Sequence, residues 1–154
     1  YVDKGDPYFC YCQKTARLIA EKLLLRDNQW KITFQSRFGK APWLQPYTDI
    51  TLMQLAHKGV KTVDVICPGF SADCLETLEE INMENRQIFL DRGGVDFGYI
   101  AALNDHPDHI KVLCDLIQQH SFGWPETMPN WDAGKRAVDA KKTRDRALRM
   151  GAKN

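Results

Sequence analysis

Three glutamates at intervals of four residues are the feature of this sequence best suited to chemistry. Glu76, Glu80 and Glu84 fall in residues 73–90, a segment whose apolar pattern predicts a long helix. Residues at i, i+4 and i+8 share one helix face, so the three carboxylates are expected to form a row, with Glu79 beside them. Carboxylate oxygens bind hard divalent cations and accept protons, so such a row can pass on either.

The same residues have a purely structural interpretation. Asp73 followed three residues later by Glu76 is typical of an N-cap with its capping-box glutamate, which stabilises a helix start. In that interpretation Glu80 and Glu84 are simply solvated. Spacing alone leaves both interpretations open.

A second candidate is the aromatic and basic stretch from Phe34 to Tyr47, which follows a predicted strand. It contains Arg37, Lys40 and Trp43 together with a glycine and two prolines. A loop of this composition can form the wall of a flat apolar ligand, with a basic side chain meeting an acidic substituent. It lacks the glycine spacing of a phosphate-binding loop. The alternative is a proline-stiffened connection whose aromatic rings cover the core.

The cysteines and histidines favour no metal site. The five cysteines are an odd number, and Cys10 and Cys12 are separated by one residue, where common zinc knuckles have two. We therefore expect free thiols in a reducing compartment. The four histidines lie in predicted helices or loops without a ligand at helical spacing, so we interpret them as structural or surface residues.

Short strands that alternate with helices predict an α/β fold, with an open parallel sheet covered by helices on both faces. The predicted strands are residues 30–35, 63–67 and 97–103, and the predicted helices include residues 16–24, 49–58, 73–90 and 107–120. In such sheets ligands bind outside the carboxyl ends of the strands. The segments at that edge begin at Ser36, Pro68 and Asn104.

Composition and charge exclude several classes of protein. The chain has 154 residues, is 44% hydrophobic and carries 21 basic and 20 acidic residues, so it can form a core and lacks the basic excess of a nucleic-acid-binding protein. No segment approaches the length of a membrane span, and we expect a cytoplasmic protein. Residues 121–154 differ, with eight basic and four acidic residues. This basic, partly helical or disordered tail either contacts an anionic membrane or acidic partner, or is a solvated appendage.

Two long motifs resemble the ferrochelatase family, in its proteobacterial form. They are TFQSRFGKAPWLQPYTD at residues 33–49 and CPGFSADCLETLEE at residues 67–80, with GDPY at 5–8 and LND at 103–105 in the same order. The resemblance covers residues 1–120 and corresponds to the C-terminal α/β domain of a chelatase-type fold, one of two similar domains. It implies insertion of ferrous iron into protoporphyrin IX in haem biosynthesis, with loss of two protons.

The resemblance also implies roles for individual residues. Glu76 matches the essential glutamate of the family, a metal ligand and proton acceptor, and Glu80 and Glu84 match the acidic path that leads from it. Trp43 and Phe70 match cleft residues beside the macrocycle. We assign Ser36 and Arg37 to the same porphyrin-binding wall.

Two departures from the family pattern qualify these expectations. Cys74 stands where many relatives have a histidine, and the family's catalytic histidine is expected in an N-terminal domain upstream of Tyr1. We therefore expect little or no activity from this chain alone. The C-terminal cysteines of the vertebrate iron–sulfur cluster have no counterpart in residues 121–154, so no cluster and no tightly bound cofactor is expected. The alternatives are a non-catalytic porphyrin- or metal-binding module and a chelatase for another metal and tetrapyrrole.

Overall fold

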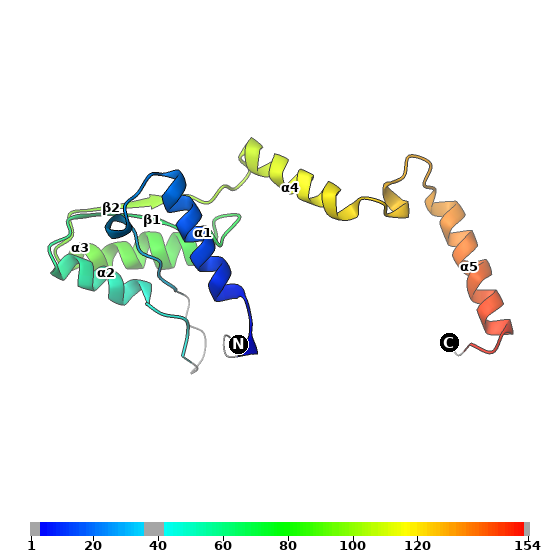
Figure 1. Ribbon diagram of the computed structural model, residues 1–154, viewed down its shortest axis with the longest axis horizontal. Helices are drawn as coiled ribbons and strands as arrows, with labels where there is room; N and C mark the ends of the chain where they lie inside the picture. Colours follow the sequence, from blue (N-terminus) through cyan, green and yellow to red (C-terminus); the bar gives the residue numbers. More distant parts are fainter. Residues whose placement is uncertain (1–3, 36–41, 153–154) are drawn as a thin grey trace. The chain divides into compact units, whose positions relative to one another are not determined.

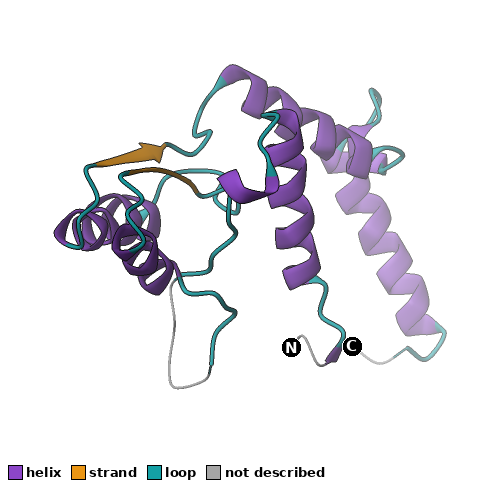
Figure 2. Cartoon of the chain, turned by 60° about the vertical axis from the view of Figure 1, so that its left-hand side comes forward, coloured by secondary structure: helices purple, strands orange, loops and turns teal. Residues whose placement is uncertain are grey.

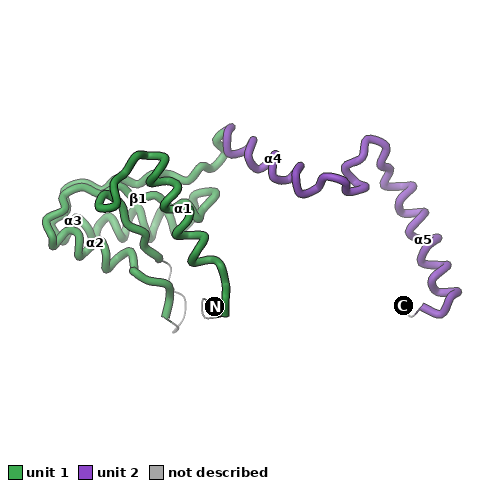
Figure 3. Tube along the Cα trace, in the orientation of Figure 1, with its two compact units in different colours: residues 1–106 green, residues 107–154 purple. Residues whose placement is uncertain are grey.

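The computed structural model describes residues 4–35 and 42–152, which form two compact units (Figure 3). Unit 1 comprises residues 1–106 and unit 2 residues 107–154. The contact boundary therefore precedes the predicted helix 107–120. The division into an α/β domain of residues 1–120 and a tail of residues 121–154 stays a prediction.

Unit 1 alternates helices with two strands (Figure 1). Its elements are α1 (Tyr8–Lys22), the 3-10 helix η2 (Asp27–Gln29), α2 (Thr48–His57), β1 (Thr62–Ile66), the π-helix η3 (Glu76–Asn85), α3 (Arg86–Asp91) and β2 (Asp96–Ile100). The helix predicted over residues 49–58 begins one residue earlier, at Thr48. Asp49 lies in its first turn, and the residue before the helix is Tyr47.

Strands β1 and β2 pair in parallel, and η3 and α3 form the connection between them. The register runs from Thr62 opposite Asp96 to Ile66 opposite Ile100. Parallel neighbours need a crossover, which a helix usually provides, so the predicted β-α-β arrangement is confirmed. A parallel α/β unit with flanking helices is the fold class that the alternating pattern indicated.

The strand predicted for residues 30–35 does not form in the described part of the chain. Phe34 makes only an isolated parallel bridge with Tyr47, in which Phe34 donates its N–H to the Pro46 carbonyl at 2.8 Å and accepts from the Thr48 N–H at 3.0 Å. A strand requires a continuous ladder, and this segment pairs at a single position. Phe34 is buried and stacks on Phe9 with ring centroids 5.8 Å apart, which agrees with the alternative in which aromatic rings of this stretch cover the core.

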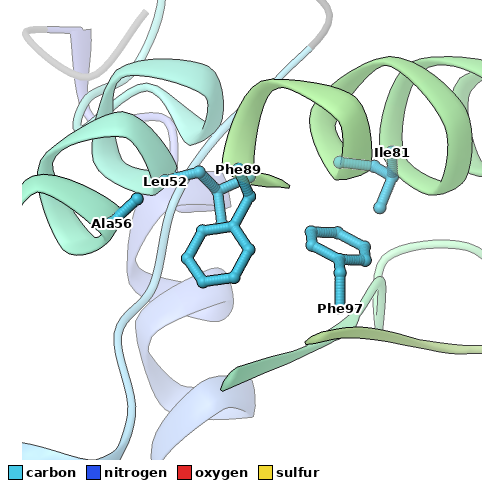
Figure 4. Packing of buried hydrophobic residues seen from close by; sticks show 5 residues of the cluster. All are labelled: Leu52, Ala56, Ile81, Phe89 and Phe97. Carbon is cyan, nitrogen blue, oxygen red and sulfur yellow. The ribbon is translucent and has the colours of Figure 1, made fainter. Parts of the chain in front are cut away.

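The core lies between the sheet and the helices α2, η3 and α3, as Figure 4 shows. Five buried residues form it: Leu52 and Ala56 from α2, Ile81 from η3, Phe89 from α3 and Phe97 from β2. Val63 and Val65 pack against this cluster from β1. The alternate residues of the strands, including Ile66 and Ile100, are exposed. The helices that contact the core therefore cover one face of the sheet, and Figure 2 shows them side by side beneath it.

The rings of Phe89 and Phe97 hold the helical layer to the sheet. Their centroids are 6.2 Å apart and their planes are tilted by 55°, a favourable arrangement for two aromatic rings. The Arg86 guanidinium also lies over the Phe97 ring, 5.2 Å from its centroid. Helix α3 ends at Asp91, one residue beyond the predicted helix 73–90, and the chain then turns at Gly93, whose φ of 99° is accessible to glycine.

Unit 2 consists of helices that bury no residue. They are α4 (Pro107–Ser121), the 3-10 helix η4 (Pro125–Thr127) and α5 (Ala133–Arg149). The predicted helix over residues 107–120 is confirmed. Asp132 is the N-cap of helix α5, since its carboxylate accepts the Lys135 N–H at 2.9 Å. Helix α5 carries most of the basic residues of the tail.

We expect Phe89→Ala to lower the free energy of unfolding by about 3–5 kcal/mol, because Phe89 is 0% exposed and its removal leaves a cavity against Phe97. Phe122→Ala is the matched control. Phe122 is 90% exposed, so its loss is expected to cost less than about 0.5 kcal/mol. Urea titrations of both variants followed by circular dichroism measure the difference. Equal effects would show that the Phe89 contact does not hold the helical layer to the sheet.

Candidate functional site

The start of η3 is bound to the carboxyl end of β2 by the side chain of Asp73. Asp73 Oδ1 accepts hydrogen bonds from the Tyr99 hydroxyl at 2.5 Å, the Thr77 hydroxyl at 3.1 Å and the Ala102 N–H at 3.2 Å. Asp73 Oδ2 accepts from Asn104 Nδ2 at 2.8 Å. Four donors therefore converge on one carboxylate.

This arrangement corrects the capping-box interpretation. The residue before η3 is Leu75, and in the described structure it provides no side-chain cap. Instead the Cys74 N–H donates to Thr77 Oγ1 at 3.0 Å, while the Asp73 carboxylate is directed to the end of β2. Sequence reasoning assigned Asp73 to a local helix cap because local contacts are all that spacing can indicate.

Hydrogen bonding to Asp73 favours its ionised form. The Tyr99 hydroxyl, then Asn104 and the Ala102 N–H, lower the pKa of Asp73 from its ordinary value of 3.8 to about 2. The carboxylate is therefore charged over the whole neutral range, and Asp73 and Tyr99 form a charge-assisted pair.

Glu76 lies three residues further along the chain and is half-buried. Its backbone carbonyl accepts a hydrogen bond from Gln35 Nε2 at 3.1 Å, which joins η3 to the start of the aromatic stretch at residues 34–47. A hydrogen bond from the Cys74 thiol, followed by one from its own backbone N–H, lowers the pKa of Glu76. Glu76 is therefore an ionised carboxylate that can accept a proton or a cation.

Glu80 and Glu84 share one open groove of about 470 Å³. Sequence reasoning placed both on one helix face, and the structure brings them to the same groove. Its lining comprises Phe34, Gln35, Thr48, Asp49, Leu75, Glu79, Glu80, Glu84, Asn85 and Ile88. Four of these residues carry carboxylates, so the groove attracts cations. Asp49 was missed as a lining residue, because its position there depends on the bridge between Phe34 and Tyr47.

The helix that carries these glutamates is a π-helix, where an α-helix was predicted. Its backbone bonds span five residues, a rare arrangement that is often found at functional sites. At its end, Asn85 Nδ2 donates to the Glu80 carbonyl at 2.6 Å and Arg86 Nε donates to the Asn82 carbonyl at 2.9 Å. Asn85 is buried, and its Oδ1 has no hydrogen-bond partner among the described residues. Side-chain bonds to helix carbonyls of this kind are invisible in apolar periodicity.

The other predicted site residues that the structure describes lie outside the groove that contains Glu80 and Glu84. Trp43 is 40% exposed, and Phe70 is half-buried after a turn in which its N–H donates to the Cys67 carbonyl at 3.0 Å. Within the described residues, neither Trp43, Phe70 nor Glu76 lines the groove. Ser36 and Arg37 lie outside the described residues, so their predicted contacts are not tested.

The described cysteines are all free thiols. Burial, followed by the nearby Asp73 and Cys74, raises the pKa of Cys67 to about 11, which keeps this thiol protonated. Across residues 4–35 and 42–152, no three or more His, Cys, Asp or Glu side chains are grouped so as to hold a metal ion. In the same residues, no helix is both long enough and apolar enough to cross a bilayer.

The lowered pKa of Asp73 predicts an acid-dependent contribution to stability. This contribution is fully present above pH 3.8, the ordinary value, and is lost as the pH falls toward about 2. We therefore expect Asp73→Asn to be less stable than the wild type at neutral pH, with the difference shrinking across this range. Urea unfolding at a series of pH values measures it. Asp27→Asn, at an exposed position, is the control. A difference between wild type and Asp73→Asn that does not change with pH would contradict the assignment.

Comparison with known proteins identifies a family over most of the chain. Residues 1–121 match the family model described as ferrochelatase. Curated relatives with the same name extend the match. The chain is 54% identical over 154 residues to the ferrochelatase of Thioalkalivibrio sulfidiphilus, covering 100% of this chain and 42% of that protein. It is 58% identical over 131 residues to that of Marinobacter nauticus, covering 84% and 35%. The chain thus spans about two fifths of these relatives' length.

Proposed function

Because this chain belongs to the ferrochelatase family, we propose that it is the C-terminal part of an enzyme that inserts ferrous iron into protoporphyrin IX to give protohaem. The observation that carries the proposal is the ionised Glu76 at the start of a π-helix, just beyond the carboxyl end of a parallel strand. Ligands of α/β sheets bind at this edge.

The chemistry requires a base and a route for charge. Two pyrrole protons must leave the macrocycle as the metal enters, and a carboxylate beside the ring can assist both events. In the proposal Glu76 contacts the iron substrate and accepts a proton. Glu80 and Glu84, in their shared groove, pass protons or iron ions to and from it. The carboxylates of Glu79 and Asp49 add to the negative potential of this groove and so favour cations there.

The porphyrin is proposed to bind against the aromatic motif. Trp43 and Phe70 supply apolar contacts for the flat macrocycle, and Ser36 and Arg37 supply polar contacts for its substituents. The exposure of Trp43 supports this role, because an indole in contact with a ligand must be accessible to it.

The remaining parts of the proposal concern partners and location. The part of the enzyme that the relatives possess beyond this match is proposed to supply the other wall of the cleft and the family's histidine, so this chain alone is expected to have little or no activity. We place the enzyme in the cytoplasm, without an iron–sulfur cluster. The basic residues of α5 are suited to peripheral contact with an anionic membrane.

Glu76→Gln in the full-length enzyme is expected to lower the rate of iron insertion by about 10²- to 10⁴-fold, the usual contribution of a positioned acid–base group. Porphyrin binding is expected to persist, because glutamine keeps the shape of the side chain. Anaerobic insertion is followed by loss of porphyrin fluorescence, and Glu126→Gln in η4 is the matched control. Near wild-type insertion by Glu76→Gln would contradict its role. A wild-type enzyme that binds porphyrin without inserting iron would instead favour the non-catalytic alternative.

Trp43→Ala in the full-length enzyme is expected to weaken porphyrin binding roughly 2- to 10-fold, corresponding to about 0.5–1.5 kcal/mol of aromatic stacking. Fluorescence titration measures the dissociation constant. Trp131→Ala is the matched control, because Trp131 has the same exposed fraction, 40%, and lies in unit 2. If both variants bind porphyrin like the wild type, Trp43 does not contact the macrocycle.

A further inference from the structure

We propose that Tyr99 and Asn104 are positioning residues that act through Asp73 to fix the helix start that carries Glu76. The inference rests on the proposed function, since it concerns the same carboxylate. The sequence placed Asn104 at the ligand-binding edge of the sheet without a role, and it did not single out Tyr99. The hydrogen bonds that assign them this role join segments far apart in the chain.

Asn104 and Asp73 hold each other by two reciprocal hydrogen bonds. The Asp73 N–H donates to Asn104 Oδ1 at 2.8 Å, and Asn104 Nδ2 donates to Asp73 Oδ2 at 2.8 Å. The Asn104 N–H also donates to the Ser71 carbonyl at 3.0 Å. The backbone and the side chain of Asp73 are therefore both fixed, which restrains rotation as well as position.

The backbone of Asn104 is adapted to this contact. Its φ is 48°, in the left-handed region that asparagine tolerates better than most residues. Asn104 Nδ2 also donates to the Ala102 carbonyl at 3.1 Å, which stabilises the turn after β2. The left-handed backbone of Asn104 is costly for most residues, and it occurs here where it lets the Asn104 side chain form both hydrogen bonds with Asp73.

Tyr99 holds the opposite oxygen of Asp73 from within the sheet. Its hydroxyl donates to Oδ1 at 2.5 Å, while its ring packs against the hydrophobic core. The ring is thereby anchored by the same cluster that joins the sheet to the helices. Strand β2 therefore fixes the position of the Asp73 carboxylate directly.

Thr77 and Cys74 connect Asp73 to Glu76. Thr77 is fully buried, and its hydroxyl donates to Asp73 Oδ1 at 3.1 Å while it accepts the Cys74 N–H at 3.0 Å. Cys74 precedes Glu76 by two residues, and hydrogen bonding by its thiol lowers the pKa of Glu76. A series of hydrogen bonds therefore runs from β2 through Asp73 and Thr77 to the backbone of Cys74, just before the group that is proposed to meet iron and protons.

Neither Tyr99 nor Asn104 lines the acidic groove in the described structure, so their effect is expected on orientation rather than on ligand binding. A displacement of about 1 Å in a catalytic group can cost about 10²-fold in rate. Loss of one anchor of the Glu76 helix start is therefore expected to lower turnover without weakening porphyrin binding.

The test uses Tyr99→Phe in the full-length enzyme, which removes the hydroxyl and keeps the ring in the core. We expect kcat for iron insertion to fall about 10-fold, while the porphyrin dissociation constant stays within about twofold of the wild-type value. An unchanged kcat would contradict the inference. Asn104→Gly keeps the left-handed backbone accessible, removes the side chain and is expected to show the same pattern. Tyr11→Phe, at an exposed tyrosine of α1, is the control.

Two further measurements separate positioning from a general structural role. In the double variant Tyr99→Phe/Glu76→Gln, the loss of rate is expected to equal that of Glu76→Gln alone, because Tyr99 acts through Glu76. Amide hydrogen exchange is expected to quicken at residues 74–78 in Tyr99→Phe and to stay unchanged in α2. An additive double variant, or unchanged exchange at residues 74–78, would overturn the inference. If the wild type inserts no iron, the proposed function fails, and hydrogen exchange still decides whether Tyr99 orders this segment.

Discussion

Phe89 and Phe97 pack their rings between the helical layer and the sheet, and the arrangement of unit 1 depends on this contact. Phe97 is in β2, and Phe89 is in α3, the last helix of the connection that leads from β1 to β2. The contact thus closes the β-α-β unit, because it fixes the helices on one face of the paired strands. Gly94 is part of the same constraint. A Cβ at this position would overlap the Phe89 ring, so the chain can turn into β2 only where it carries no side chain.

The elements of the fold were predictable wherever local pattern and packing agree. The strands predicted over residues 63–67 and 97–103 and the helix predicted over residues 107–120 form close to those positions, as β1, β2 and α4. The segment around Phe34 was misassigned, because strand-forming residues and alternation indicate an extended chain but not whether it has a partner. Its buried phenylalanine stacks on α1 and makes a single bridge.

The candidate site was predictable in its residue types and less so in its geometry. The spacing of Glu80 and Glu84 indicated a shared face, and both line one groove. The π-helical form of η3 was not predictable, because the hydrogen bonds from the Asn85 and Arg86 side chains to helix carbonyls do not change the spacing of apolar residues in the sequence. The partners of Asp73 were equally hidden. A local cap and a long-range anchor use the same residue type, and only the tertiary structure distinguishes them.

The hydrogen bonds of Asp73 with Tyr99 and Asn104 join residues far apart in the chain, and this separation affects the order in which the protein folds. Tyr99 follows Asp73 by 26 residues and Asn104 follows it by 31. Each bond therefore closes a long loop, whose entropic cost must be met before the bond can form. The ends of the loop come together only once β2 has docked beside β1. We therefore expect the start of η3 to be among the last parts of unit 1 to become ordered, and a partly folded chain to display its glutamates without a defined arrangement.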